Sequence, residues 1–150
     1  MSQTLVRLLV HLVFSTKNRR DLITPDIEPD LFAYISGILK TLDSVCLEIN
    51  GTANHIHALV SQSKNLALSS LVMEIKKGSS KWIKTQGSEF KRFAWQQGYG
   101  AFSIGESGVG RLRRYIQLQK QKHEKHSFED EFIGLLKKYN VPYDPRYVWD

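Results

Sequence analysis

The order in which strand-like and helix-like segments follow one another restricts this chain to few folds. Runs rich in Val, Leu and Ile predict strands, and apolar residues repeated at intervals of three and four predict helices. The segments alternate as strand, helix, strand, strand, helix, strand and helix. They span residues 4–15, 26–42, 44–49, 53–62, 66–83, 93–104 and 109–123, and a short acidic helix follows from Ser127.

A hairpin is predicted in the middle of this series. Asn50-Gly51 is a strong turn signal between the third and fourth segments, which we expect to pair as antiparallel strands. The order of elements around this hairpin is that of the split β-α-β layout. The sequence therefore predicts an α+β fold: a ferredoxin-like (RRM-like) antiparallel sheet with helices on one face, plus an added C-terminal helix.

Size and composition fit one domain that covers residues 1–150. The 150 residues are 41% hydrophobic and 11% aromatic, which is enough to build a core and excludes wholesale disorder. Cys46 is the only cysteine, so an internal disulfide and a cysteine-rich zinc site are excluded, and we expect it to be a small buried residue.

We expect a cytoplasmic protein. The apolar run 5–14 is interrupted by Arg7 and His11, and it lacks the basic leader and cleavage site of a signal peptide. No stretch of the sequence is long and apolar enough to cross a membrane.

The charge balance suggests a polyanionic partner. The chain has 21 Lys and Arg against 15 Asp and Glu, a net charge of +6. Nucleic acid is the first candidate and an anionic membrane surface the second, although a solvated surface with surplus lysine explains the balance as well. Trp95 and Tyr99 are candidates for stacking on bases, unless they pack in the core. The DNA-binding candidates are Lys17, Arg19, Arg20, Lys76, Lys77, Arg111, Arg113 and Arg114.

His55 and His57 are separated by one residue in a predicted strand. Alternate strand residues share a face, so both imidazoles point the same way, and we expect Ile56 and Leu59 on the opposite, core side. Two imidazoles on one face can bind a single metal ion, and neutral imidazole suits Mn, Zn, Fe or Ni better than Mg. The alternative is a pair of half-buried histidines that bind nothing.

Tyr115 lies in the predicted helix 109–123, four residues before Gln119. Residues four apart share a helix face, so the amide oxygen of Gln119 can add a third metal ligand beside Tyr115. Phenol is a weak nucleophile at neutral pH because its pKa is about 10, and a metal ion on the scissile phosphate would assist the attack. The alternative is a tyrosine buried beside Leu112 and Ile116.

Attack by the phenol on a phosphate would give a covalent phosphotyrosine, which conserves the bond energy and makes rejoining independent of ATP. No phosphate-binding loop of the Gly-x-x-x-x-Gly-Lys-Ser/Thr type is present, so we expect no nucleotide cofactor. Gly105, Gly108 and Gly110 predict a flexible hinge before the tyrosine helix.

Other nucleophiles and ligands are less favourable. Cys46 has no basic neighbours that would lower the pKa of its thiol, and no Gly-x-Ser-x-Gly elbow is present. His123 and His126 lie three residues apart, but the lysines around them favour a solvated basic helix end over a metal site.

Five ordered segments resemble the single-tyrosine HUH transposases, the small transposases of hairpin-ended insertion sequences and their REP-associated relatives. His55-Ile56-His57 and Tyr115-Ile116-x-x-Gln119 carry the resemblance. The similarity extends over residues 5–135. The other similar segments are 13–17 (VFSTK), 95–103 (WQQGYGAFS) and 127–132 (SFEDEF).

The resemblance implies a ferredoxin-like core, an obligate homodimer, and single-stranded DNA with imperfect hairpins as the substrate. It implies Mg or Mn held by His55, His57 and Gln119. It also implies attack by Tyr115, which leaves a 5′-phosphotyrosine and a free 3′-hydroxyl. In such dimers the tyrosine helix often completes the partner's site, so Tyr115 acts either in its own subunit or in the other.

Two positions depart from the family pattern. Related sequences often carry an acidic residue after the glutamine and paired histidines further on. Here these places hold Lys120 and Lys122-His123, which we expect to alter DNA contacts without abolishing the chemistry.

The sequence therefore predicts a metal-dependent DNA transposase with a tyrosine nucleophile. One alternative is a domesticated relative that processes repeated palindromes of its host genome. Another is a non-catalytic binder of single-stranded nucleic acid on an RRM-like fold, which needs aromatic residues exposed on the sheet face. The distance between Tyr115 and the histidine pair separates the enzyme from the binder.

Overall fold

The computed structural model describes residues 2–150 and contains a four-stranded antiparallel sheet in the order β2-β3-β1-β4. Each strand–helix–strand unit skips one strand, since α1 connects β1 to β2 across β3, and α2 connects β3 to β4 across β1. The predicted ferredoxin-like α+β fold is confirmed. These elements are β1 (Leu8–Ser15), α1 (Glu28–Thr41), β2 (Val45–Thr52), β3 (His55–Gln62), α2 (Leu68–Ile83) and β4 (Gly100–Ser103).

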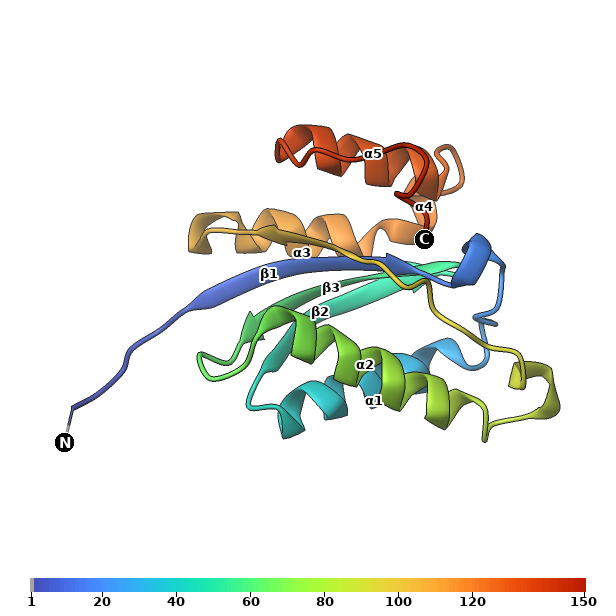
Figure 1. Ribbon diagram of the computed structural model, residues 1–150, viewed down its shortest axis with the longest axis horizontal. Helices are drawn as coiled ribbons and strands as arrows, with labels where there is room; N and C mark the ends of the chain where they lie inside the picture. Colours follow the sequence, from blue (N-terminus) through green and yellow to red (C-terminus); the bar gives the residue numbers. More distant parts are fainter. Residues whose placement is uncertain (1) are drawn as a thin grey trace.

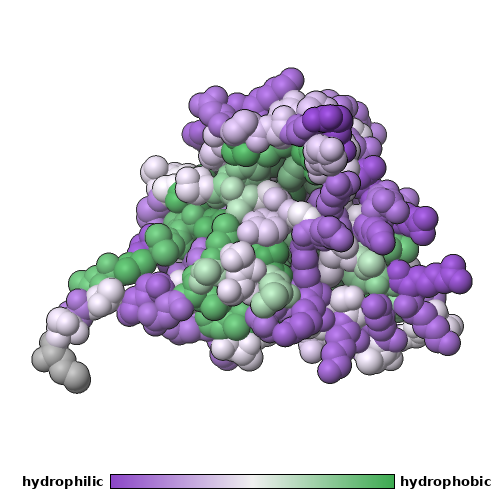
Figure 2. All heavy atoms as spheres, viewed as in Figure 1, coloured by the Kyte–Doolittle hydropathy of each residue, from purple (hydrophilic) through white to green (hydrophobic). Residues whose placement is uncertain are grey.

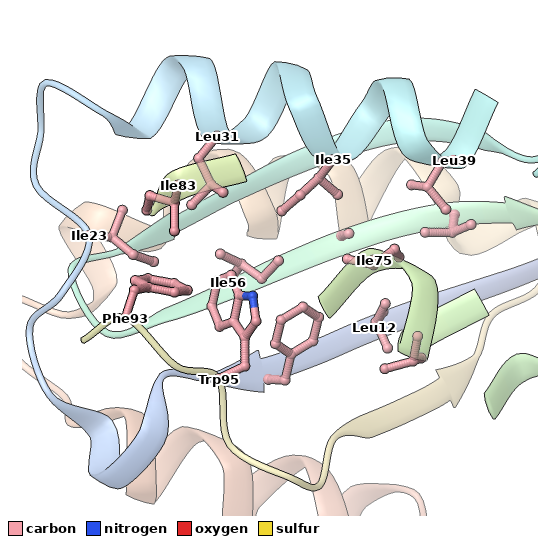
Figure 3. Packing of buried hydrophobic residues seen from close by; sticks show 14 of the residues in the cluster. Leu12, Ile23, Leu31, Ile35, Leu39, Ile56, Ile75, Ile83, Phe93 and Trp95 are labelled. Atoms are coloured by element: carbon pink, nitrogen blue, oxygen red, sulfur yellow. The ribbon is translucent and has the colours of Figure 1, made fainter. Parts of the chain in front are cut away.

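Helices α1 and α2 cover one face of the sheet and enclose the main core with it (Figure 1). Leu31 and Ile35 of α1 and Ile75 of α2 are fully buried because their helical spacing directs one apolar stripe of each helix toward the sheet. From the sheet, Leu12 and Ile56 point into the same cluster (Figure 3). This side of the molecule is apolar packing.

Three C-terminal helices form a layer on the other face of the sheet (Figure 1). They are α3 (Val109–Gln117), α4 (Gln119–Lys122) and α5 (Phe128–Lys138). Leu59 packs there against Ile116, although it was expected on the opposite, core side with Ile56. Leu59 is two residues beyond His57, so the strand alternation places it on the histidine face, and that prediction was wrong.

The hairpin turn lies at Ala53-Asn54, and the predicted turn at Asn50-Gly51 is wrong. Both residues belong to the β2 ladder, where Asn50 pairs with His57. Gly51 is needed for close approach, because a Cβ at this position would overlap the backbone carbonyl of His55. Turn propensity is overridden here by the tertiary structure.

Replacing Gly51 with alanine should destabilise the fold by about 2 kcal/mol, because the added Cβ forces two paired strands apart. Urea denaturation should show a lower midpoint with an unchanged slope. Gly105→Ala is the matched control, since nothing lies within 4 Å of a Cβ built there. Equal midpoints for the two variants would contradict the close approach.

The predicted long helix 109–123 is interrupted at Leu118, which has φ −95° and ψ 15° and separates α3 from α4. The Asn50 side chain donates hydrogen bonds to the carbonyl oxygens of Ile116 at 2.9 Å and Gln117 at 3.1 Å. These carbonyls would otherwise accept the bonds of a continuing helix. The interruption therefore follows from a contact with β2.

Two predicted strands are shorter than expected. In segment 93–104 only Gly100–Ser103 forms β4, and Trp95 makes an isolated bridge with Thr16. The first strand begins at Leu8, and the preceding arm extends from the body with Leu5 83% exposed (Figures 1 and 2). Short 3-10 helices occur at η1 (Lys17–Arg19), η2 (Ser88–Phe90) and η3 (Glu106–Gly108), the last within the predicted glycine hinge.

The C-terminal segment docks on the body of the domain. Ser127 caps α5, its hydroxyl accepting from the backbone N–H of Asp130 at 3.1 Å. Trp149 packs against Phe132 of α5, and the backbone oxygen of Asp150 accepts from the N–H of Gln97 at 2.8 Å.

Cys46, expected to be buried, is half-buried. Within residues 2–150, no helix has the length and apolar character to cross a membrane.

Candidate functional site

His55 and His57 lie on the central strand β3 and point into the layer beneath the C-terminal helices. Both are fully buried, at 0% exposure. Burial, followed by the charge of neighbouring His57, lowers the pKa of His55 to about 3, so its imidazole is neutral at physiological pH. Neutral imidazole is the form that binds metal ions.

Two residues from the C-terminal layer complete a four-residue cluster with these histidines. They are His123, which follows α4, and Glu131 on α5. One ligand atom from each of the four residues lies within 4.8 Å of all the others. Glu131 Oε1 is 2.9 Å from His57 Nε2, 2.9 Å from His123 Nε2 and 3.6 Å from His55 Nε2.

Hydrogen bonds on the far side of two imidazoles determine which nitrogen carries the proton. His123 Nδ1 is 2.7 Å from the carbonyl oxygen of His126, which can only accept, so Nδ1 is the donor. His55 Nδ1 is likewise a donor, 2.8 Å from Asn54 Oδ1. In the neutral rings Nε2 then carries a lone pair directed at Glu131. Such lone pairs repel a carboxylate unless a cation lies among them, which favours a metal site.

Gln119 adds a fifth polar group to the cluster. Its side chain is fully buried, with Oε1 3.0 Å from His55 Nε2 and Nε2 donating to Glu131 Oε2 at 2.9 Å. Adjacent ligands of an octahedral ion with bonds of about 2.1 Å lie about 3 Å apart, so these separations fit a shared cation. Lys120 anchors this segment through an ion pair with Glu28 at 2.7 Å.

Tyr115 meets the cluster of its own chain through Glu131. Its hydroxyl donates a hydrogen bond to Glu131 Oε2, the oxygen that also accepts from Gln119. The Tyr115 ring lies 5.8 Å from the His57 ring and crosses it nearly edge-on. Burial, together with the negative charge of Glu131, raises the pKa of the Tyr115 phenol far above its usual value. The phenol is therefore protonated at physiological pH.

Glu131 is the common partner of all these groups. Its carboxylate oxygens lie 2.9 Å from His57 Nε2 and 2.9 Å from His123 Nε2, and they accept the hydrogen bond of the Tyr115 hydroxyl. Glu131 therefore links the imidazoles to the phenol.

His11 on β1 supports the cluster from behind. Its Nε2 lies 2.8 Å from His57 Nδ1, and the two rings are stacked 5.0 Å apart. Burial, followed by the charge of His57, lowers the pKa of His11 to about 3. A partner at Nδ1 orients the ring so that His57 Nε2 faces Glu131.

Three of these residues were not found from the sequence. His123 was interpreted as part of a solvated helix end, which is wrong, because α5 packs over it and Glu131 contacts it. Glu131 lies in the similar segment 127–132, so only the resemblance gave a signal for it. His11 was seen as a break in an apolar run, and its pairing with His57 depends on the strand register.

The basic residues proposed to bind DNA differ in whether their side chains are already bound by other residues of the chain. Lys76 Nζ donates to the carbonyls of Gln96 at 2.8 Å and Gly98 at 2.6 Å, and burial lowers its pKa to about 8. Arg113 pairs with Glu48 at 3.2 Å, and Lys77 pairs with Glu74 at 3.1 Å.

The remaining DNA-binding candidates have fewer partners within the chain. Arg19 lies over the Trp149 ring at 4.9 Å and 3.9 Å from Glu129. Within residues 2–150 the other four are exposed and make no side-chain ion pair, namely Lys17, Arg20, Arg111 and Arg114.

Trp95 cannot stack on bases as it stands. It is 8% exposed, it packs edge-on against Phe14 and Phe93, and its indole N–H donates to Ser79 Oγ at 2.9 Å. The stacking interpretation was wrong because the segment before β4 turns inward, beneath α2. Tyr99 is half-buried beside Lys76.

Comparison with known proteins identifies the family of this chain. The model of the family described as IS200-like transposases matches residues 4–119, which is most of the chain. The matched range includes the strand histidines, Tyr115 and Gln119, and it ends before His123. No curated protein matches the chain.

Two solved structures have a similar fold. One is a presumed transposase from Deinococcus radiodurans R1, with a TM-score of 0.62 and 16% identity, over 79% of this chain and 98% of that chain. The other is a REP-associated tyrosine transposase bound to a REP hairpin, with a TM-score of 0.62 and 18% identity, over 82% of this chain and 74% of that chain. At these identities the likeness concerns the fold.

Proposed function

This chain belongs to the family of IS200-like transposases, and we propose that it cleaves and rejoins single-stranded DNA at hairpin-containing element ends. Tyr115 is the proposed nucleophile, and the intermediate is a covalent 5′-phosphotyrosine. One observation carries the proposal: the Tyr115 hydroxyl and the imidazole cluster of the same chain share the carboxylate of Glu131.

The proposed metal ligands are His55, His57 and Gln119, joined by His123 and Glu131. Their donor atoms converge with separations of 2.9 to 3.6 Å from Glu131 Oε1 or His55 Nε2, and two imidazoles direct lone pairs at the same place. We expect Mg or Mn, and three imidazoles favour Mn. A divalent ion bound there would act as a Lewis acid on the scissile phosphate.

The residues of the chain account for the strand cleavage. The Tyr115 oxygen forms a bond to phosphorus while the bond from phosphorus to the 3′ oxygen of the neighbouring nucleotide breaks. The phenolic proton passes to Glu131 Oε2, which already accepts the Tyr115 hydrogen bond, and the leaving 3′ oxygen takes a proton from water. Rejoining reverses these changes when a 3′-hydroxyl attacks the phosphotyrosine.

The substrate is proposed to be single-stranded DNA with hairpins, as in the REP-associated relative of similar fold. We also propose a homodimer, with residues 1–150 as one transposase domain. A domesticated role in processing REP-like palindromes is the second candidate, favoured by the same structural neighbour. A non-catalytic RRM-like binder is disfavoured, since helices cover both faces of the sheet (Figure 1).

A covalent adduct tests the proposed function. A radiolabelled hairpin strand incubated with the protein and Mn should give a labelled protein band that survives denaturation, and EDTA should prevent it. After trypsin digestion the label should reside on peptide 115–120, which begins at the nucleophile because cleavage follows Arg114. A label on any other peptide would contradict the assignment of Tyr115, and the absence of any adduct would contradict the proposed chemistry.

A further inference from the structure

Two cavities adjoin the Tyr115 side chain, one on each side. The larger has a volume of about 330 Å³ and is lined by Lys122, His126 and Asp130, among others. The smaller has a volume of about 190 Å³ and lies between α3 and α5. Tyr115, Leu135 and Lys138 line both cavities, so the two adjoin across these side chains, and we refer to them together as the groove.

The smaller cavity has aromatic and aliphatic walls. His11 and Tyr139 contribute rings, and the Tyr139 ring is itself stacked on Phe102 at 4.9 Å. Leu112 and Ile104 add apolar surface, and Figure 2 shows apolar atoms between the hydrophilic outside of α5 and the layer below it. A water molecule has a share of about 30 Å³ in the liquid, so the cavity suits a larger, flat and apolar group.

Cations along this groove lack acidic partners, unlike their neighbours. Arg113 and Lys120 are held in ion pairs with acids of their own chain. Within residues 2–150, by contrast, Arg111, Lys122 and Lys138 form no ion pair. Lys122 Nζ lies 5.1 Å from the centre of the Tyr115 ring and Lys138 Nζ lies 5.6 Å from that of Tyr139. The groove is lined by these three positive side chains and by two acidic ones, Asp130 and Glu131, so its net charge is positive and attracts a chain of phosphates.

We infer that a DNA single strand crosses Tyr115 along this groove and inserts one unpaired base, next to the scissile phosphate, into the smaller cavity. The backbone phosphates then lie against Lys122, Lys138 and Arg111. The inference rests on the proposed function, and it adds a base-binding subsite to the same centre. A duplex cannot bind in this way without unpairing, so the subsite selects for single strands.

Binding in EDTA tests the subsite without any cleavage. The probes are a fluorescent thymidine strand of about 20 nucleotides and an abasic strand with the same number of phosphates. Leu112→Trp and Gly108→Leu fill the cavity, and Val45→Trp, on the exposed edge strand, is the matched control. Each filled variant should lower the thymidine affinity at least about fivefold, the lower bound for one stacked base, and should leave the abasic affinity unchanged.

Lysine variants separate the phosphate contacts from the base contact. Lys122→Gln and Lys138→Gln should weaken both probes equally and reduce the slope of log affinity against log salt by about 0.7 each. Lys137→Gln, an exposed neighbour on α5 outside both cavities, should change neither. Unequal losses for the two probes would overturn the assignment of these lysines.

A filled, folded variant that keeps the full preference for thymidine over the abasic strand would overturn the base subsite. Formation of the covalent adduct tests the transferase chemistry separately, because the ratio of thymidine to abasic affinity is measured without cleavage. If both filled variants unfold, the base subsite is tested on the unaltered protein by cross-linking. Ultraviolet cross-linking of a 5-iodouracil strand should then label Tyr139, and cross-links confined to other aromatic residues would overturn the subsite.

Discussion

Tyr115→Phe is expected to abolish the covalent adduct and to lower the rate of strand cleavage at least about a thousandfold, the scale of loss when a nucleophile is removed. The substitution deletes one oxygen and leaves the ring packed edge-on against His57 and His11. The neighbours of Tyr115 include Glu131, His57 and Lys122, and none of these side chains has a hydroxyl that could form the same phosphodiester. The measurement is denaturing electrophoresis of the radiolabelled strand with Mn.

The fold should survive this substitution. The lost hydrogen bond joins the phenol to Glu131, which keeps its contacts with His57, His123 and Gln119. We expect the free energy of unfolding to fall by about 2 kcal/mol, the net value of one hydrogen bond to a charged group. Tyr34→Phe is the control, since Tyr34 stacks on Trp82 on the far side of the sheet. An adduct that persists in Tyr115→Phe, or disappears in Tyr34→Phe, would contradict the assignment of the nucleophile.

The parts of the site on one strand were predictable from local geometry. His55 and His57 share a face in any strand, because side chains alternate with a period of two. The neighbouring error, Leu59, came from misapplying the same rule and not from a tertiary effect. The order of elements predicted the sheet topology for a similar reason, since each segment has a clear period and the connections are short.

Contacts between distant segments were not predictable in this way. Glu131 is 74 residues from His57, and its carboxylate reaches the imidazole only because α5 folds over the sheet. The lysines around His123 suggest a solvated helix end, and nothing local shows that the ring on its inner side is covered. A carboxylate on a surface helix and one inside a metal site look alike in a single sequence.

Strong local signals also failed where tertiary contacts outweighed them. Asn50-Gly51 has the composition of a tight turn, but Asn50 caps the end of α3 and Gly51 admits a neighbouring carbonyl. Trp95 lies among the polar and glycine residues of segment 95–103, yet Ser79 of α2 accepts its indole N–H inside the core. In both cases the residue type is explained by a partner that is remote in sequence.

Glu131→Ala is expected to remove the metal site while the chain still folds. Loss of an outer partner of a metal ligand weakens binding about 10- to 100-fold, so loss of this central carboxylate should weaken Mn binding at least about 100-fold. Glu131 Oε1 lies within 3.6 Å of three imidazole nitrogens, and its negative charge offsets the repulsion between a cation and the surrounding basic groups. Strand cleavage should be lost together with the metal.

Thermal unfolding measures this effect without reference to activity. At about 100 times its dissociation constant, Mn should stabilise the unaltered protein by about 2.7 kcal/mol and raise its melting temperature by several degrees. Glu131→Ala should show no such rise, and Glu131→Gln an intermediate one, because the amide oxygen remains but the charge is gone. Glu129→Ala is the control on the same helix, since the Glu129 side chain is 47% exposed and lies outside the cluster.

The two ways in which this prediction can fail have different meanings. If Mn stabilises Glu131→Ala as much as the unaltered protein but not His55→Ala, the carboxylate is not a ligand, and its task is to hold Tyr115 and Gln119 in place. If Mn stabilises all three proteins equally, the ion binds elsewhere.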